Sequence, residues 1–253
     1  MKDNNNMIPY LRHKRILDVM EKNEITTIEE LRTELGGRSV STIRRDLIHL
    51  EKQGQIILLR GGAAKMLPLD KFELSISKKL LLNVEAKERI AKYAASIVED
   101  GDVIYIDSGT TPQYMLKYLK QKDITLVTTN MRIYQEENLQ NFKVILVGGE
   151  INHALASTSG PITDNQLNQF FFEKAFLGAN GFSEIAGINT FDTREKNKKQ
   201  IVKQNAKLTY VLVDSSKAGK ITLCKCLELD ECTIITDKDN EIIQKYSGIV
   251  VES

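Results

Sequence analysis

The stretch over residues 39–54 constrains the fold most strongly, because its pattern predicts one amphipathic helix with defined ends. An apolar stripe at helical spacing is formed by Val40, Ile43, Leu47 and Leu50. Ser39 is a suitable N-cap, and Gly54 can end the helix. Arg44 and Arg45 lie off the stripe, and adjacent guanidinium groups on a short helix suit the major groove of DNA. An ordinary solvated surface helix is the alternative interpretation.

The segments around this helix predict a winged helix-turn-helix domain. Residues 11–20 carry apolar residues at helical spacing and predict a first helix. A second helix is expected to begin at Thr26 or Thr27, since each lies three residues before a glutamate, the spacing of a capping box. Two glycines then allow a tight turn, and residues 55–60 predict a short strand after the arginine-bearing helix. This order of elements is typical of the winged helix-turn-helix.

A long run of residues with ordered spacing matches a known signature. It consists of Ser39, Thr42, Ile43, Arg44, Arg45, Asp46, Leu47, Leu50, Glu51, Gly54, Gly61, Gly62 and Ala63. The run resembles the DNA-binding signature of the DeoR family of bacterial transcription regulators. The resemblance implies that this helix and the wing contact double-stranded operator DNA, through Ser41, Thr42, Arg44, Arg45, His49 and Arg60. Asp46 lies nearer the core side, and we expect it to position an arginine or to cap a neighbour.

Two departures separate the chain from the usual signature. The turn at residues 36–38 is one residue longer than the usual family turn. Ile57 and Leu58 stand where the family tends to carry arginine, which leaves Arg60 as the basic residue near the tip of the wing. The fold expected from the resemblance is the same with or without these differences.

The length of 253 residues suits two domains, and 42% apolar with 27% charged residues is ordinary for a soluble protein. No apolar run is long enough to cross a bilayer, and the N-terminus lacks a secretory apolar segment, so a cytoplasmic protein without membrane contact is expected. Residues 1–66 hold 12 basic and 9 acidic residues, and the remainder holds 23 and 25. The small excess of positive charge in the first part has the sign expected of a DNA-binding domain.

The three cysteines, Cys224, Cys226 and Cys232, invite a metal or disulfide hypothesis. An odd number without an export signal argues against a disulfide framework, and the absence of a nearby histidine argues against a metal. We therefore expect buried free thiols. The three histidines are scattered and form no catalytic constellation, so neither a metal nor a cofactor is expected.

The sequence predicts three parts of the chain: a DNA-binding domain at residues 1–64, a linker at 65–82 and an α/β domain at 83–253. In the last part, short apolar strands are expected at residues 103–106, 124–127, 143–147, 174–177, 208–213, 233–235 and 249–251. Helices are expected between most of them, at residues 85–99, 112–119, 131–139, 164–171, 194–205 and 240–246. This alternation predicts a largely parallel sheet covered on both faces.

Polar and glycine-rich residues follow the predicted strands, where ligands bind to parallel sheets. The first strand is followed by Asp107, Ser108, Gly109, Thr110 and Thr111, and the later ends include Thr129, Asn130, Gly148, Gly149, Asp214 and Lys217. Glycine permits close approach, hydroxyls donate hydrogen bonds and a helix N-terminus presents free N–H groups, so the first end suits a phosphate. Any one end alone could be an ordinary turn or helix cap. With residues 178–181 and 236–237, which also follow predicted strands, six such ends at one edge favour an anion pocket.

This half of the chain also matches a family pattern, in Asp107, Gly109, Thr110, Thr111, Thr129, Asn130, Gly148, Gly149, Phe176, Leu177, Gly178, Asp214, Ser216, Lys217, Thr236 and Asp237. These residues resemble the DeoR C-terminal sensor domain, which is similar in fold to ribose-5-phosphate isomerase and typically binds phosphorylated sugars or related metabolites. The resemblance implies a phosphate held by residues 108–111 and Lys217, and sugar hydroxyls oriented by Asp107, Asn130 and Asp214. The polar segment at residues 188–199 is expected to set the identity of the ligand.

Together these features predict a DNA-binding repressor of carbohydrate metabolism genes whose operator affinity is modulated by a phosphorylated sugar. Because one helix-turn-helix reads one half-site, a homodimer or tetramer is implied. The alternative is a sugar-phosphate isomerase-like enzyme with a fused DNA-binding domain, in which Asp107, Asp214 and Lys217 support proton transfer. The sequence offers no clear glutamate or histidine base at a strand end, which favours the regulator.

Overall fold

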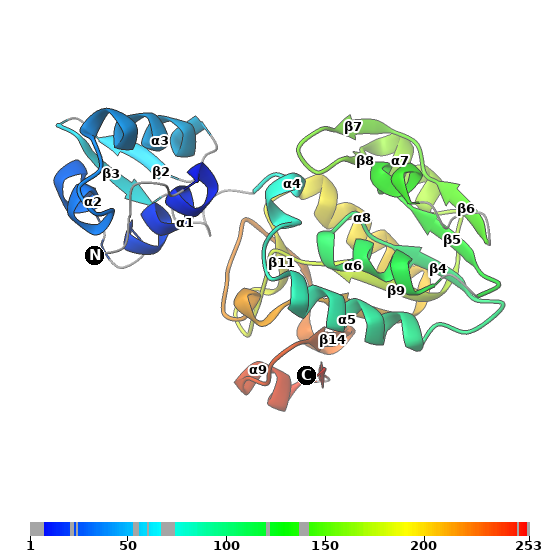
Figure 1. Cartoon of the computed structure of the whole chain (residues 1–253). Coiled ribbons are helices and arrows are strands. Elements are labelled where there is room, and N and C mark those ends of the chain that lie inside the picture. The colour runs from blue at the N-terminus through cyan, green and yellow to red at the C-terminus, as the bar shows by residue number, and fades with distance from the viewer. Residues whose placement is uncertain are drawn as a thin grey trace. The chain divides into compact units, whose positions relative to one another are not determined.

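The computed structural model describes residues 8–20, 23, 25–52, 56–59, 61–66, 74–119, 122–136, 142–246 and 248–251. The chain divides into two compact units, Met1–Phe72 and Glu73–Ser253, and each is described by itself (Figure 1). Within the described residues, no helix has the length and apolar character needed to span a membrane. Part of the expected linker, residues 67–73, lies outside the described residues.

The first unit is a winged helix-turn-helix, as predicted. Its elements are α1 (Pro9–Met20), β1 (Thr26–Thr27), α2 (Ile28–Glu34), α3 (Val40–Lys52), β2 (Ile56–Leu59) and β3 (Ala63–Met66). The three strands form an antiparallel sheet in the order β1-β3-β2. Its core is built from side chains of all three helices and the sheet: Ile16, Leu31, Ile43, Leu47, Leu50, Ile56 and Ala64. The apolar stripe expected on α3 therefore packs into this core.

Local contacts and glycines explain where α2 and α3 begin and how the chain turns between them. Of the two candidate capping boxes, the one at Thr27 forms: Glu30 N donates to Thr27 Oγ1 at 3.2 Å, and Thr27 N donates to the Glu30 carboxylate at 2.7 Å. Thr26 precedes Thr27 in β1 and is buried. Gly36 and Gly37 adopt positive φ values of 69° and 80° in the turn before α3, a conformation that glycine adopts without strain. Ser39 caps α3, because its Oγ accepts a hydrogen bond from Thr42 N at 3.2 Å.

The second unit is organised by a seven-stranded parallel sheet in the order β15-β14-β12-β9-β4-β5-β6. Its strands are β4 (Val103–Ile106), β5 (Thr125–Thr128), β6 (Lys143–Leu146), β9 (Phe172–Gly178), β12 (Ala206–Leu212), β14 (Thr233–Thr236) and β15 (Gly248–Val250). Every neighbouring pair in this sheet is parallel. The predicted parallel α/β architecture is therefore confirmed. The direction in which the strands are added reverses between β4 and β9.

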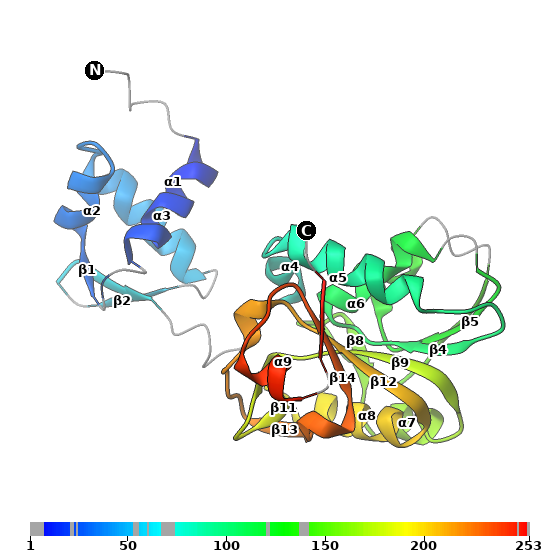
Figure 2. The same ribbon diagram turned by 90° about the horizontal axis from the view of Figure 1, so that it is seen from below.

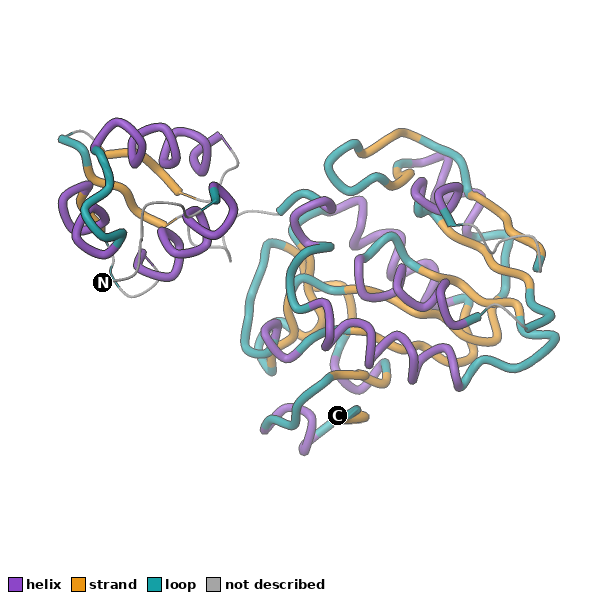
Figure 3. Tube along the Cα trace, viewed as in Figure 1, coloured by secondary structure: helices purple, strands orange, loops and turns teal. Residues whose placement is uncertain are grey.

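Helices cover both faces of this sheet. On one face, α5 (Val84–Ser96), α6 (Thr110–Tyr114) and the 3₁₀ helix η2 (Met115–Tyr118) pack on β4 and β5. On the other face, α7 (Pro161–Leu167) and α8 (Thr193–Gln204) contribute Leu167 and Val202 to a second apolar cluster. Figure 2 shows the sheet between these two layers, and Figure 3 shows its strands alternating with the helices.

The remaining elements are short. They are α4 (Ile76–Lys79), α9 (Glu241–Lys245), the 3₁₀ helices η3 (Met131–Gln135), η5 (Ser215–Lys217) and η6 (Leu229–Glu231), the hairpin of β7 (Glu150–Asn152) and β8 (Ser157–Ser159), and an antiparallel sheet of β10 (Gly181–Ser183), β11 (Gly187–Thr190) and β13 (Cys224–Leu227). The sequence predicts neither the hairpin nor the antiparallel sheet. Residues 131–139 were expected to form an α-helix, but η3 ends at Gln135 and residues 137–140 lie outside the described part.

One helix begins earlier in the chain than the sequence predicts. The helix expected at residues 164–171 begins at Pro161, because Gly160 turns the chain with a φ of 91° and proline suits the first helical turn.

All three cysteines are free; Cys226 and Cys232 are buried and Cys224 is half-buried. Burial raises the pKa of Cys226 to about 11 and that of Cys232 to about 12, so both thiols stay protonated at neutral pH.

Candidate DNA-binding face and effector site

The outer side of α3 carries the candidate DNA contacts. Arg44, Arg45 and His49 are exposed, as is Ser41, whereas Thr42 is half-buried. The hydroxyls in the first turn form a group, because Ser39 Oγ lies 3.0 Å from Ser41 Oγ and 2.9 Å from Thr42 Oγ1. Both arginines are thus available to a duplex, and neither is held in the core.

The wing is the β2–β3 hairpin. Gly61 and Gly62 turn it with φ values of 93° and 81°. Ile57 projects outward with 42% exposure, whereas Leu58 is half-buried against the core of the unit. Arg60, expected to steady the phosphate backbone, lies outside the described residues, so its contact remains a prediction.

The candidate effector site begins where the strand order reverses, between β4 and β9. The carboxylate of Asp107 accepts hydrogen bonds from Gly178 N at 3.0 Å and from Ser108 N at 2.8 Å. A side chain on Gly109 would begin 3.3 Å from Gly178 Cα, so the two loops approach closely. Such a reversal point is where open parallel sheets bind ligands. Ser108, Thr110 and Thr111 follow Asp107 here, and all three are buried.

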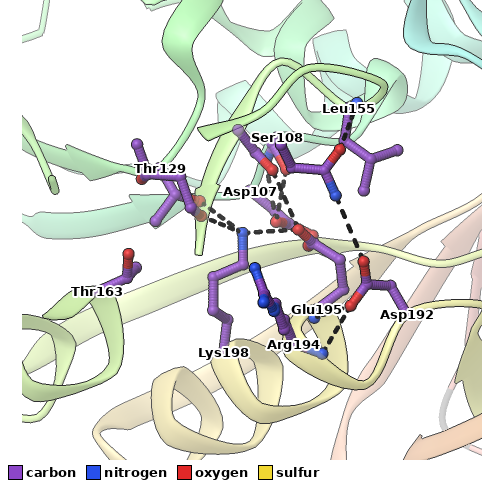
Figure 4. A network of polar contacts seen from close by, with 12 residues as sticks. Asp107, Ser108, Thr129, Leu155, Thr163, Asp192, Arg194, Glu195 and Lys198 are labelled. Atoms are coloured by element: carbon purple, nitrogen blue, oxygen red, sulfur yellow. Dashed lines mark hydrogen bonds and ion pairs between the residues drawn. The ribbon is translucent and has the colours of Figure 1, made fainter. Parts of the chain in front are cut away.

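Two buried lysines of α8 reach this edge. Lys199 pairs with Asp107, and Lys198 Nζ lies 2.8 Å from Thr158 O. Lys198 Nζ also lies 2.8 Å from the Glu195 carboxylate and 3.3 Å from Thr129 Oγ1 (Figure 4). The four charged residues are between 1% and 5% exposed. Burial opposes the charge of Lys199, but Asp107 and Glu195 outweigh it and raise its pKa. Likewise, Lys199 and Lys198 outweigh burial and lower the pKa of Asp107. The Lys199–Asp107 pair is therefore ionised at neutral pH.

The ends of β5 and β8 add polar groups to the lysine cluster. Ser157 Oγ donates to Glu195 at 3.1 Å, and Asn130 forms an isolated bridge with Ser157. The Oδ1 of Asn130 accepts from Arg132 N at 2.9 Å. Among the described residues, neither Asn130 Nδ2 nor Ser159 Oγ has a hydrogen-bond partner, although both side chains are buried. Unpaired buried polar groups are unfavourable, so these two atoms are candidates for ligand contacts.

Both units of the chain match domains of known proteins. Residues 12–66 match the DeoR-like helix-turn-helix domain, and residues 82–238 match the DeoR C terminal sensor domain. The sequence is 37% identical to an uncharacterized HTH-type transcriptional regulator, FruR, of Bacillus subtilis strain 168, over 91% of this chain and 92% of that protein. The chain belongs to the DeoR family. It is also 30% identical to the lactose phosphotransferase system repressor of Staphylococcus aureus strain NCTC 8325, over 79% of this chain and 81% of that protein.

Membership of the DeoR family makes this chain a DNA-binding transcription regulator. Similar solved structures include ribose 5-phosphate isomerase A of Methanocaldococcus jannaschii, with 21% identity and a TM-score of 0.41 over 55% of this chain and 56% of that one. They also include the translation initiation factor eIF-2B of Pyrococcus horikoshii, with 15% identity and a TM-score of 0.39 over 85% of this chain and 68% of that one. Likenesses at this level say nothing about activity.

The DeoR sensor residues predicted from the sequence divide between the two faces of the sheet. Asp107 and Thr129 contact α8, as described above. Asp214 lies toward the other face, where its carboxylate accepts from Asn83 Nδ2 at 2.8 Å and from the Ser216 backbone N–H at 3.2 Å. Asn83 directly precedes α5 and adopts a left-handed φ of 51°. Lys217 is half-buried at the end of η5, close to this second group.

Gly148 and Gly149 are held by α7. Gly148 N donates to the Gln166 side chain at 3.2 Å, and Gly148 O accepts from Thr163 Oγ1 at 2.7 Å. Gly149 has a φ of 146°, and a side chain there would collide with Thr163 Oγ1. Close packing against α7 therefore explains why glycine is needed at Gly149, and a contact of either residue with a ligand remains a prediction.

Glu195, Lys198 and Lys199 are the residues that sequence reasoning missed. They lie within the polar segment expected to set ligand identity, but no individual residue was singled out. A lysine-rich helix is usually solvated, and the burial of these lysines depends on Asp107 and on β8. A weak signal existed, because Glu195 stands three and four residues before the two lysines, the spacing of helical ion pairs.

Proposed function

We propose that this DeoR-family regulator represses carbohydrate metabolism genes and that a phosphorylated sugar, bound at the carboxyl edge of its parallel sheet, changes its affinity for operator DNA. The observation that carries the effector site is the pair of unpartnered buried donors, Asn130 Nδ2 and Ser159 Oγ, on the segments that surround the buried amine of Lys198. A phosphorylated polyol offers acceptors for such donors and negative charge for a lysine.

The relatives support the choice of a sugar-linked regulator. One is named a lactose phosphotransferase system repressor and another is named FruR. In the proposed complex, Ser41, Thr42, Arg44, Arg45 and His49 contact DNA, with Arg60 at the backbone. The proposed effector contacts are those expected from the sequence together with Lys198. A homodimer or tetramer would present two or more copies of α3 to successive half-sites.

The geometry does not favour the enzyme alternative. Asp107 is engaged by Lys199 on the α8 side, and Asp214 is engaged by Asn83 on the α5 side. An acid and a base that act on one sugar must reach the same substrate atoms, and these carboxylates lie toward opposite faces of the sheet. The relatives, moreover, are named as transcription regulators. We infer that this edge of the sheet binds a ligand and does not convert it.

A thermal-shift screen tests the effector proposal. The full-length protein is heated with glucose 6-phosphate, fructose 6-phosphate, fructose 1-phosphate, galactose 6-phosphate or ribose 5-phosphate, and with inorganic phosphate and the free sugars as controls. A ligand at 100 times its Kd stabilises the fold by about 2.7 kcal/mol, which raises Tm by roughly 5–10 °C for a domain of this size. Ligands found in this way are then added to gel-shift assays. If no sugar phosphate raises Tm or changes DNA binding, the effector proposal is wrong; rapid isomerisation of a hit would favour the enzyme.

A further inference from the structure

A carboxylate lies beside the two arginines of the candidate DNA-reading helix. Asp46 directly follows Arg45 on α3, and an exposed negative charge at this position would repel DNA phosphates. Asp46 is only 4% exposed, however, because its side chain turns away from Arg44 and Arg45 and lies under α1. The acid is therefore part of the contact between the two helices.

Both oxygens of the Asp46 carboxylate are bound by α1. Arg12 Nε lies 2.5 Å from Oδ2 and Arg12 Nη2 lies 2.8 Å from Oδ1, so the guanidinium grips the acid as a two-pronged fork. His13 Nε2 lies 3.0 Å from Oδ1. Burial opposes ionisation of Asp46, but the hydrogen bonds from Arg12 and His13 outweigh it and lower its pKa. Asp46 thus holds an arginine, as the sequence suggested, and that arginine comes from α1.

A second contact lies three residues further along α3. The ring of His13 stacks on that of His49, with centroids 4.9 Å apart and an angle of 26° between the planes. Because Asp46 and His49 are about one helical turn apart, α1 holds the same side of α3 at two successive points. Apolar contacts such as those of Ile16 and Leu47 bring the helices together but are not directional. The fork and the stacked rings are directional, so they define how α3 is rotated about its axis.

We propose that Asp46, held by Arg12 and His13, is a positioning residue for DNA reading: it fixes the rotation of α3 and hence the direction in which Arg44 and Arg45 leave the helix. A bidentate contact between arginine and a base needs alignment to within roughly 10–20°. The inference rests on the proposed use of α3 as the DNA-reading helix. It adds Arg12, which no sequence pattern marked, to the residues that determine specificity.

Three possible roles of Asp46 lead to different results when the charge is removed. If the acid only stabilises the fold, a folded variant binds every duplex as the wild type does. If it acts only through its negative charge, its removal strengthens binding to all DNA. If it positions the arginines, binding to the specific duplex weakens while binding to unrelated DNA is kept, because non-specific binding needs phosphate contacts alone.

The experiment compares two duplexes with the full-length protein. One duplex is selected by the wild-type protein from a random library, and the other is a scrambled duplex of the same length and composition. The variants are Asp46→Asn and Arg12→Lys, and Arg15→Lys is the matched control, since Arg15 also lies on α1 but pairs with Glu34 at the surface. We expect Asp46→Asn to lower the ratio of specific to non-specific affinity at least 10-fold. Arg12→Lys, which keeps the charge but loses the fork, should lower it less, and the control should stay within twofold.

Circular dichroism confirms that each variant is folded at the temperature of the binding assay. A wild-type affinity ratio in folded Asp46→Asn overturns the proposal, and so does an equal rise in affinity for both duplexes. If Asp46→Asn does not fold, Arg12→Lys carries the same test. Arg45→Ala separates this inference from the proposed DNA face: if Arg45→Ala removes specific binding and the Asp46 variant does not change it, only the positioning role fails.

Discussion

Lys199 and Asp107, 92 residues apart in the chain, form an ion pair in which neither side chain is more than 6% exposed. The pair joins α8 to the end of β4 at the point where the strand order of the sheet reverses. Because Asp107 also accepts the N–H of Gly178 at the end of β9, one carboxylate connects three elements.

The first prediction concerns this pair. Lys199→Met leaves the Asp107 carboxylate buried without its partner, and such a loss typically destabilises a fold by about 3–5 kcal/mol. Urea unfolding followed by tyrosine fluorescence measures it, because seven of the eight tyrosines lie in Glu73–Ser253. The double variant Lys199→Met/Asp107→Asn should recover part of the loss, because asparagine removes the buried charge and keeps an oxygen that can accept the Gly178 N–H. Lys245→Met, which breaks the exposed pair with Glu184, is the control and should change stability by less than about 1 kcal/mol. Equal effects of Lys199→Met and the control would contradict the prediction.

The pH dependence of the same pair follows from its pKa shifts. The pKa of Asp107 is lowered, so its contribution is present above its unfolded value and is lost as pH falls through the lower folded value. The pKa of Lys199 is raised, so its contribution is present below its unfolded value and is lost only as pH rises through the higher folded value. The pair therefore stabilises the unit across the whole neutral range.

The second prediction concerns Arg45. Arg45→Ala should weaken operator binding at least 10-fold, since one bidentate arginine–base contact is worth about 1–3 kcal/mol. Binding of the effector and the size of the oligomer should be unchanged, because Arg45 is exposed on α3 and belongs to the first unit. Gel-shift titration and analytical ultracentrifugation measure the two properties. Wild-type affinity in the gel-shift assay would remove Arg45 from the DNA contacts.

The third prediction concerns Lys217. Lys217→Ala should weaken the response to the effector and leave DNA binding without ligand intact, because the residue lies at the end of η5 in the second unit. The measurement is a titration with the sugar phosphate that raises Tm most, and the value compared is the ligand concentration at the midpoint of the change in operator binding. An unaltered titration would show that the phosphate does not need Lys217.

The fourth prediction concerns Lys198. Lys198→Met should abolish the thermal stabilisation by sugar phosphates, whereas Lys198→Arg, which keeps the positive charge, should retain part of it. Because Lys198→Met leaves the buried Glu195 carboxylate without this partner, circular dichroism first establishes that both variants are folded. Operator binding of the folded variants in the absence of ligand should be that of the wild type. If Lys198→Met still responds fully, the ligand is held elsewhere on the edge of the sheet.

The fifth prediction concerns Lys87 of α5, whose pKa is lowered to about 8 by burial and, to a smaller extent, by Lys217 and Lys79, against the attraction of Asp214. Above pH 8 the folded chain releases this proton before the unfolded chain does, so the contribution of Lys87 to the free energy of unfolding should rise between pH 8 and about 10. The buried thiols of Cys226 and Cys232 have raised pKa values and contribute the opposite trend, so the effect of Lys87 is measured as a difference between variants. The gain is at most about 3 kcal/mol. Urea unfolding followed by circular dichroism should show that the free energy of unfolding of the wild type rises relative to that of Lys87→Met over this range. The difference between the wild type and the exposed control Lys92→Met should not change with pH.

The sequence predicts those parts of the fold that local patterns encode. All seven strands of the parallel sheet were expected to within a few residues, because each is a short apolar run such as Val103–Ile106. In contrast, β8 (Ser157–Ser159) is fully buried although it contains only serine and threonine. Its burial depends on contacts with distant residues, among them Glu195, and no local pattern marks such contacts. For the same reason the candidate site was predicted at the strand ends but not on α8.

The pairing of β4 with β9 also determines when the second unit can be completed during synthesis. Ile104 of β4 lies opposite Lys174 of β9, so the centre of the sheet cannot close until about 70 further residues have been made. Among the described residues, the core of the first unit is built from residues between Ile16 and Ala64. A nascent chain that ends before Phe172 would therefore carry a finished DNA-binding unit beside a β4 strand with an open edge, the kind of edge that recruits other chains.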